Sequence, residues 1–154
     1  MAKRFRKHKP TVRDGSVALH DHLITVAATA RERYGPEMDF AAIVQILDDR
    51  EIVRYPVSLA FDDAPLQTGE FAFPEPIGCH PSEGYTLFIH PYLEGNLEAL
   101  PLLIGYQLVR INYGDVASHE EAEVFGAALC EMDRDAYYEQ ICRIADSIPV
   151  SAET

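Results

Sequence analysis

Four side chains in this sequence are candidates for binding a divalent metal ion. His119 and Glu121 lie two positions apart, and His80 and His90 each precede a proline further upstream. Imidazole and carboxylate groups are ligands of Zn²⁺, which in a hydrolase activates a bound water molecule. A metal-dependent hydrolase built on these four residues is therefore one interpretation of the sequence.

The segment around Glu121 has a second interpretation, as the start of a helix. Ser118 and Glu121 have the spacing of a capping box, in which each side chain binds the backbone N–H of the other residue. Acidic side chains in a first turn also complement the helix dipole. Glu121 and Glu123 project about 200° apart around a helix, so they cannot face one site. We favour this interpretation, which requires no metal.

The predicted helix upstream carries the spacing of a zinc motif but not its side chains. In an HExxH motif, two histidines four residues apart bind zinc, and the glutamate after the first histidine activates the water. Tyr106, Gln107 and Arg110 occupy these three places. Tyrosine is a poor zinc ligand at neutral pH, glutamine cannot act as a base, and arginine is a permanent cation. We therefore expect no bound zinc and no other cofactor.

The order of segments around these positions resembles the ImmA/IrrE-type zinc peptidase domain. Met38–Leu47 and Gly69–Ala72 are similar to the short helix and the glycine-led strand of that family, and Glu121–Met132 is similar to its ligand-bearing helix. The resemblance implies a zincin-like fold over roughly residues 17–145. Within it, Glu121 matches the third zinc ligand, and the packing positions are matched by Phe125, Ala127 and Leu129.

The same resemblance implies a substitute for the missing metal ion. Arg110 stands at the second histidine and Glu121 at the third ligand, so an Arg110–Glu121 ion pair would place a guanidinium where the cation belongs. A carboxylate that faces an apolar helix is costly to leave unpaired. In the alternative interpretation, Arg110 extends into solvent and Glu121 only completes its capping box.

The spacing of apolar residues predicts an α+β fold: two N-terminal helices, a small sheet, a central buried helix and two C-terminal helices. The helices are expected at 17–34, 40–47, 97–113, 119–131 and 134–147. Ser16 is the expected cap of the first helix, whose inward face is formed by Val17, His20, Leu23, Ile24, Ala27, Ala30 and Tyr34. The strands are expected at 52–55, 57–61, 70–73 and 85–90. Pro56 marks an edge strand or a bulge, and residues 74–84 form an irregular loop. Leu97–Tyr113 is apolar on nearly every side, which favours burial at the centre of the domain.

Charge divides the chain into two parts. Residues 1–13 carry six basic side chains and no acid, whereas the rest carries seven arginines and 25 acids. We therefore expect a disordered basic tail at 1–13 and a single domain at 14–154. So acidic a domain repels phosphates, which disfavours a nucleic acid as a partner except through the tail. The sequence holds no apolar run that could span a membrane.

The three cysteines indicate a reducing environment, because they are odd in number and lack CxxC spacing. We expect a cytoplasmic protein in which Cys130 and Cys142 are buried thiols without a disulfide. Three functions stay open. The first is a non-catalytic domain, a pseudoenzyme on a degenerate metallopeptidase-like scaffold, that acts through contacts with an unidentified protein. The second is a zinc hydrolase or peptidase that uses His80, His90, His119 and Glu121. The third is a small-molecule-binding protein with residues 74–84 as a lid.

Overall fold

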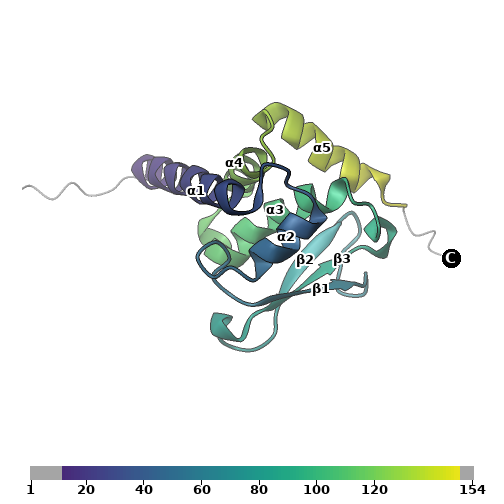
Figure 1. Ribbon diagram of the computed structural model, residues 1–154. Helices are drawn as coiled ribbons and strands as arrows, with labels where there is room; N and C mark the ends of the chain where they lie inside the picture. Colours follow the sequence, from purple (N-terminus) through teal and green to yellow (C-terminus); the bar gives the residue numbers. More distant parts are fainter. Residues whose placement is uncertain (1–11, 150–154) are drawn as a thin grey trace, which may run out of the picture.

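The computed structural model of this chain describes residues 12–149, which form an α+β fold (Figure 1). Its helices are α1 (Val12–Tyr34), α2 (Phe40–Leu47), α3 (Ala99–Tyr113), α4 (His119–Leu129) and α5 (Arg134–Ser147). Its strands are β1 (Val57–Phe61), β2 (Ala72–Pro76) and β3 (Tyr85–Ile89). Short 3₁₀ turns lie at Pro81–Glu83, Pro91–Leu93 and Gly114–Val116. The order of two helices, a small sheet and three helices confirms the predicted fold class.

The three strands form one mixed sheet in the order β1-β3-β2. Strand β1 runs parallel to β3, and β2 runs antiparallel to it. The position of β1 at an edge agrees with the expectation from Pro56. The strand predicted at 52–55 is absent from the described residues: Ile52 and Val53 are buried in a turn instead. The Asn112 side chain binds the Ile52 carbonyl (2.8 Å) and the Arg54 N–H (2.9 Å), so these backbone groups are satisfied without a sheet.

Strand β2 runs through two prolines that the sequence analysis assigned to a loop. The His90 N–H donates to the Phe71 carbonyl (2.8 Å), and the Ile77 N–H donates to the Gly84 carbonyl (3.0 Å). Along an antiparallel strand, every second residue points its N–H and C=O groups toward the neighbouring strand. Phe71 and Ile77 bind the β3 side, so the even-numbered residues between them point these groups away from β3. Pro74 and Pro76 are two of these, and a missing N–H on the outer edge of a sheet costs no ladder bond.

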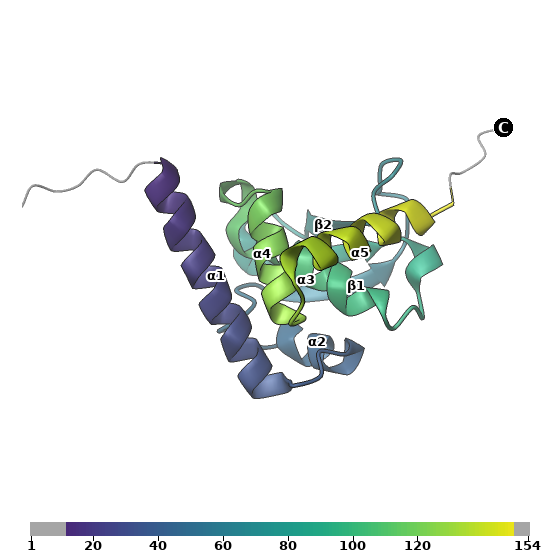
Figure 2. The same cartoon turned by 90° about the horizontal axis from the view of Figure 1, so that it is seen from above.

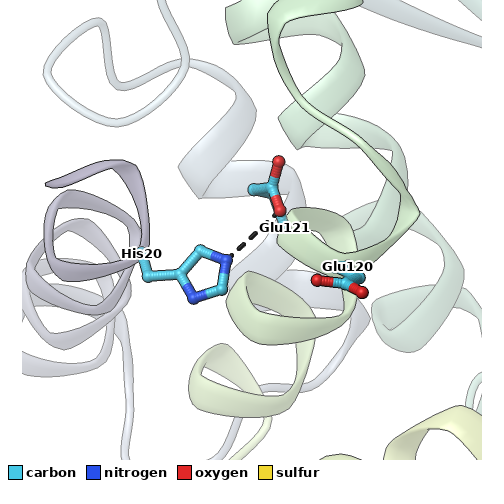
Figure 3. Close-up of side chains that lie close together, drawn as sticks. All are labelled: His20, Glu120 and Glu121. Carbon is cyan, nitrogen blue, oxygen red and sulfur yellow. Dashed lines mark hydrogen bonds and ion pairs between the residues drawn. The ribbon is translucent and has the colours of Figure 1, made fainter. Parts of the chain in front are cut away.

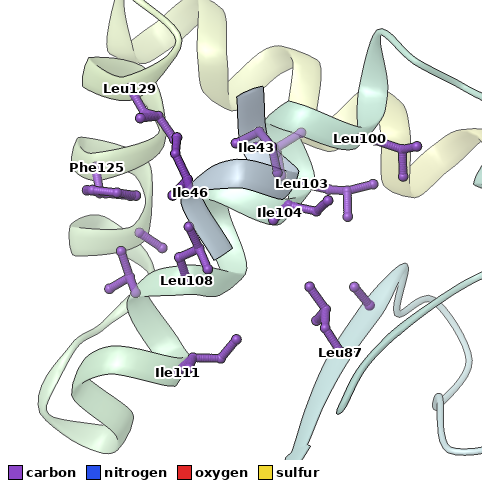
Figure 4. Packing of buried hydrophobic residues seen from close by; sticks show 14 of the residues in the cluster. Ile43, Ile46, Leu87, Leu100, Leu103, Ile104, Leu108, Ile111, Phe125 and Leu129 are labelled. Atoms are coloured by element: carbon purple, nitrogen blue, oxygen red, sulfur yellow. The ribbon is translucent and has the colours of Figure 1, made fainter. Parts of the chain in front are cut away.

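Helix α3 lies at the centre of the core. The views in Figures 2 and 4 place it between α2, α4, α5 and the sheet. Five of its large apolar side chains are at most 1% exposed, namely Leu100, Leu103, Ile104, Leu108 and Ile111, which confirms the predicted central helix. They meet side chains from the surrounding elements, among them Ile43 and Ile46 of α2, Leu87 of β3, and Phe125 and Leu129 of α4 (Figure 4).

Helix α1 is longer than its sequence pattern predicts and lies alongside α4 (Figure 2). It begins at Val12, so Ser16 lies inside it and is not its cap. Residues 12 and 13 therefore belong to the helix, and the rest of the predicted basic tail lies outside the described residues. Leu23, Ala27 and Ala30 are fully buried, but Val17 and Ile24, which were expected to face inward, are half exposed.

Candidate functional site

Glu121 is a buried carboxylate at the start of α4, and its capping box is formed as predicted. The Ser118 N–H donates to Oε1 of Glu121 (3.1 Å), and the Ser118 hydroxyl donates to Oε2 (3.0 Å). The same hydroxyl accepts from the Glu120 N–H (3.2 Å). The first turn of α4 thus satisfies its own backbone donors and holds the Glu121 carboxylate in place.

His20 of α1 reaches the same carboxylate from across the α1–α4 contact (Figure 3). Its Nε2 atom lies 3.2 Å from Oε2 of Glu121. Together with Glu120, the two residues offer one imidazole nitrogen and two carboxylate oxygens that all lie within 4.8 Å of one another. Within the described part of the chain, these three residues form the group in which at least three potential metal-ligand atoms lie this close together. The sequence pattern placed His20 on the inward face of its helix but did not pair it with Glu121, because helical spacing does not identify a partner 101 positions away.

The surroundings of Glu121 favour its ionised form. Burial by itself raises the pKa of this carboxyl. The hydrogen bonds from Ser118 and His20 outweigh burial, and the net pKa is lower than that of an ordinary glutamate. Glu121 therefore carries a negative charge that accepts hydrogen bonds from Ser118 and His20.

The three side chains at the HExxH positions, those of Tyr106, Gln107 and Arg110, have partners within the protein. The Tyr106 hydroxyl is hydrogen-bonded to Nδ1 of His119 (2.7 Å). Burial, followed by the charge of Glu123, raises the pKa of Tyr106, so its phenol stays protonated. Gln107 is buried, and its Oε1 atom lies 3.5 Å from Nη1 of Arg110. None of these three side chains offers an anionic or imidazole ligand, so the residues present do not fit a zinc ion at this place.

The predicted Arg110–Glu121 ion pair is not formed between these two described residues. The Arg110 guanidinium lies instead over the ring of Phe73, 5.6 Å from its centroid. Glu121 is bound by Ser118 and His20. The pair was wrong because another helix supplies the partner of Glu121, and the alternative interpretation holds for Glu121: it completes its capping box.

The other histidines considered as ligands cap short turns. Nδ1 of His80 accepts from the Ser82 N–H (3.1 Å), and Nδ1 of His90 accepts from the Tyr92 N–H (3.1 Å). Nε2 of His90 lies 3.8 Å from Asp63. Among residues 17–149, no group of three close ligand atoms contains His80, His90 or His119. The structure does not bring these three histidines together with Glu121.

A cavity of about 500 Å³ opens between the β1–β2 loop and the end of α5. Carboxylates line it, namely Asp63, Glu70 and Asp146, together with His90. Apolar side chains form another part of its wall, namely Leu66, Ala145, Ile148 and Pro149, and residues 67–69 complete it. Residues 74–84, which were expected to form a lid, do not line this cavity.

All three cysteines are free thiols, so the prediction of no disulfide is confirmed. Cys130 and Cys142 are only half-buried, which is less than predicted, and Cys79 is exposed. Burial raises the pKa of the Cys130 thiol to about 12. A thiol of such a high pKa is a poor nucleophile, which leaves Cys130 a packing residue.

Comparisons with protein-family models, with curated proteins and with solved structures found no match to this chain. Within the described part of the chain, no helix combines the length and the apolar character needed to cross a bilayer.

Proposed function

We propose that this chain is a non-catalytic domain, on a scaffold similar to that of ImmA/IrrE-type zinc peptidases, that acts through contacts with another protein. The occupancy of the motif positions supports this proposal most directly. Arg110 would repel a Zn²⁺ ion, and Tyr106 is already bound to His119. Glu121, the remaining match to a zinc ligand, is satisfied by Ser118 and His20.

The sheet edge beside these residues also argues against peptide cleavage. Extended peptides commonly bind by adding a strand to an open sheet edge. Tyr106 and Arg110 contact Phe71 and Phe73 at the edge formed by β2. Pro74 and Pro76 have no N–H to donate along that edge. A substrate chain laid there would lack the regular donors that fix its register.

Restoring the motif tests the proposal. The triple variant Tyr106→His, Gln107→Glu and Arg110→His recreates both helical ligands and the base. On a zincin-like scaffold it should retain about one zinc ion per chain after dialysis against a weak chelator, whereas the wild-type protein should retain none. Elemental analysis measures the metal, and circular dichroism verifies that the variant is folded.

A matched variant supplies the control for this experiment. Tyr106→Phe, Gln107→Glu and Arg110→Lys change the same positions but restore neither histidine, so no zinc should be retained. Stoichiometric zinc in the wild-type protein would overturn the non-catalytic assignment. A folded triple variant that binds no zinc would contradict the scaffold itself.

The cavity beside α5 supports a second candidate function, the binding of a small organic cation. Its lining within residues 12–149 includes three carboxylates and no lysine or arginine. The apolar wall suits a ligand with a hydrocarbon part. A panel of alkyl amines should raise the melting temperature, whereas carboxylic acids with the same alkyl chains should not. Asp146→Asn should reduce the shift, and an equal response to acids and amines would dispose of this candidate.

A further inference from the structure

The outer edge of β1 carries backbone groups that nothing in the described residues binds. The Tyr85 N–H donates to the Pro56 carbonyl (2.8 Å), and the Asp62 N–H donates to the Ile89 carbonyl (3.0 Å). In a parallel ladder with this register, the even-numbered residues of β1 therefore bind β3. The N–H and C=O groups that point outward belong to the alternate residues, Val57, Leu59 and Phe61.

The two edges of the sheet differ in the hydrogen-bonding groups that they offer to an added strand. Pro74 and Pro76 remove donors from the outer edge of β2, a common device against edge-to-edge pairing. Strand β1 has the sequence Val-Ser-Leu-Ala-Phe, without proline, glycine or charge. A five-residue uncharged edge, whose outward donors and acceptors bind none of the described residues, is a template for a further strand.

We propose that a second copy of this chain pairs with β1 in antiparallel orientation, with Leu59 opposite Leu59 of the other copy. In this register Val57 of each copy lies opposite Phe61 of the other. The outward N–H and C=O groups of Val57, Leu59 and Phe61 in one copy then lie opposite the same groups of the other copy, so all of them can form hydrogen bonds. The result is a twofold-symmetric dimer with one continuous sheet across the interface. This inference holds whether or not the domain is catalytic.

Charges at the two ends of β1 favour the antiparallel orientation and a second copy of the chain as the partner. Arg54 precedes the strand, where its guanidinium lies over the Tyr113 ring, 4.6 Å from the centroid. Asp62 and Asp63 follow the strand, and both are exposed. Antiparallel pairing brings Arg54 of one copy to the Asp62–Asp63 end of the other. Parallel pairing would instead bring Arg54 to Arg54 and the aspartates together, which is repulsive.

The mass of the native protein in solution gives the first test. Light scattering after size-exclusion chromatography at about 0.15 M salt, which screens the net negative charge, should give twice the 17.2 kDa of one chain. The dimer should dissociate on dilution. A monomer at every concentration up to roughly 100 µM, where micromolar complexes form, would overturn the proposal.

Two double variants test the register. Ser58 of one copy lies opposite Ala60 of the other, so Ser58→Lys with Ala60→Lys puts like charges face to face twice. Ser58→Lys with Ala60→Glu puts opposite charges at the same places. The first variant should dimerise about tenfold more weakly than the second.

Glu75→Lys on β2 is the control at the other sheet edge and should leave the mass unchanged. Circular dichroism and melting curves identify any variant that fails to fold. If the two double variants, which differ only in Lys or Glu at position 60, form equally strong dimers, β1 is not the interface. If the mass stays monomeric until a different protein is added, β1 does not serve a second copy.

Discussion

His20 and Glu121 are separated by 101 positions in the chain, and the imidazole Nε2 of the first lies 3.2 Å from a carboxylate oxygen of the second. The carboxylate can only accept, so the imidazole is the donor. The Glu121 side chain is 9% exposed, whereas that of His20 is 29% exposed. This contact links α1 to the start of α4, and Arg31 of α1 donates to the Leu129 carbonyl (3.1 Å) at the other end of α4. Buried apolar side chains of α1, among them Leu23 and Ala27, belong to the hydrophobic core.

Removing the imidazole should weaken the attachment of α1 to α4. We expect His20→Ala to lower the free energy of unfolding by about 1 kcal/mol, because Glu121 keeps its two bonds from Ser118 and loses the third. Asp21→Ala, at the exposed next position of α1, should change the stability little. Urea unfolding of both variants measures the difference. Equal stability of His20→Ala and the wild type would show that water replaces the imidazole without loss.

The charge of Glu121 should make stability depend on pH in the acidic range. Its pKa in the folded protein is lower than its ordinary value, so the stabilisation is complete above the unfolded pKa and is lost as the pH falls through the folded pKa. We expect the stability advantage of the wild type over Glu121→Gln to shrink on acidification below about pH 4.3, the ordinary pKa of glutamate. Unfolding curves for both proteins between about pH 5 and pH 3 measure it. If the stability advantage of the wild type instead grows on acidification, the pKa of Glu121 is not lowered in the folded protein.

Gly126 of α4 makes room for a buried tyrosine of α5. A methyl group at this position would overlap the Tyr137 phenol. Tyr137 is fully buried, and its hydroxyl donates to the Leu102 carbonyl of α3 (2.6 Å). Gly126→Ala should therefore destabilise the protein by about 1–3 kcal/mol, the usual cost of overpacking, despite the better helix propensity of alanine.

Gly105→Ala is the matched control for that prediction. Its added methyl group would lie 3.3 Å from a methyl of Leu129, so Leu129 would have to move by only a few tenths of an ångström. Thermal or urea unfolding should show little change at Gly105 and a clear loss at Gly126. Similar stabilities of the two variants would mean that Tyr137 does not fill the space beside Gly126.

The features that the sequence predicted correctly depend on neighbouring residues. Asp39 caps α2 through the Ala42 N–H (2.8 Å), as its position before an apolar run indicated. Ser118 and Glu121 form their capping box for the same reason. The apolar circumference of α3 predicted its burial, because a helix with no polar face can lie only inside a core.

The features that the sequence did not predict depend on contacts between distant segments. The partner of Glu121 comes from α1, which the local pattern of α4 cannot reveal. Strand β2 continues through Pro74 because that residue turns its nitrogen to the outer edge, which is known only once β3 is in place. Residues 52–55 form no strand because the side-chain amide of Asn112, from α3, binds the Ile52 carbonyl and the Arg54 N–H. In each case tertiary contacts override a local preference.

The three thiols should differ in reactivity. Burial raises the pKa of Cys130 to about 12, so at pH 8 the thiolate, the reactive form, is a fraction of roughly 10⁻⁴ at this residue, against about a quarter for a free cysteine. Cys79 is exposed in the loop that precedes β3. A maleimide followed by mass spectrometry should therefore modify Cys79 first and Cys130 last in the native protein. Cys79→Ser should remove the fast phase, and all three thiols should react in strong denaturant. Fast modification of Cys130 in native Cys79→Ser protein would show that the C-terminal end of α4 opens to solvent, against the packing of Cys130 on the core.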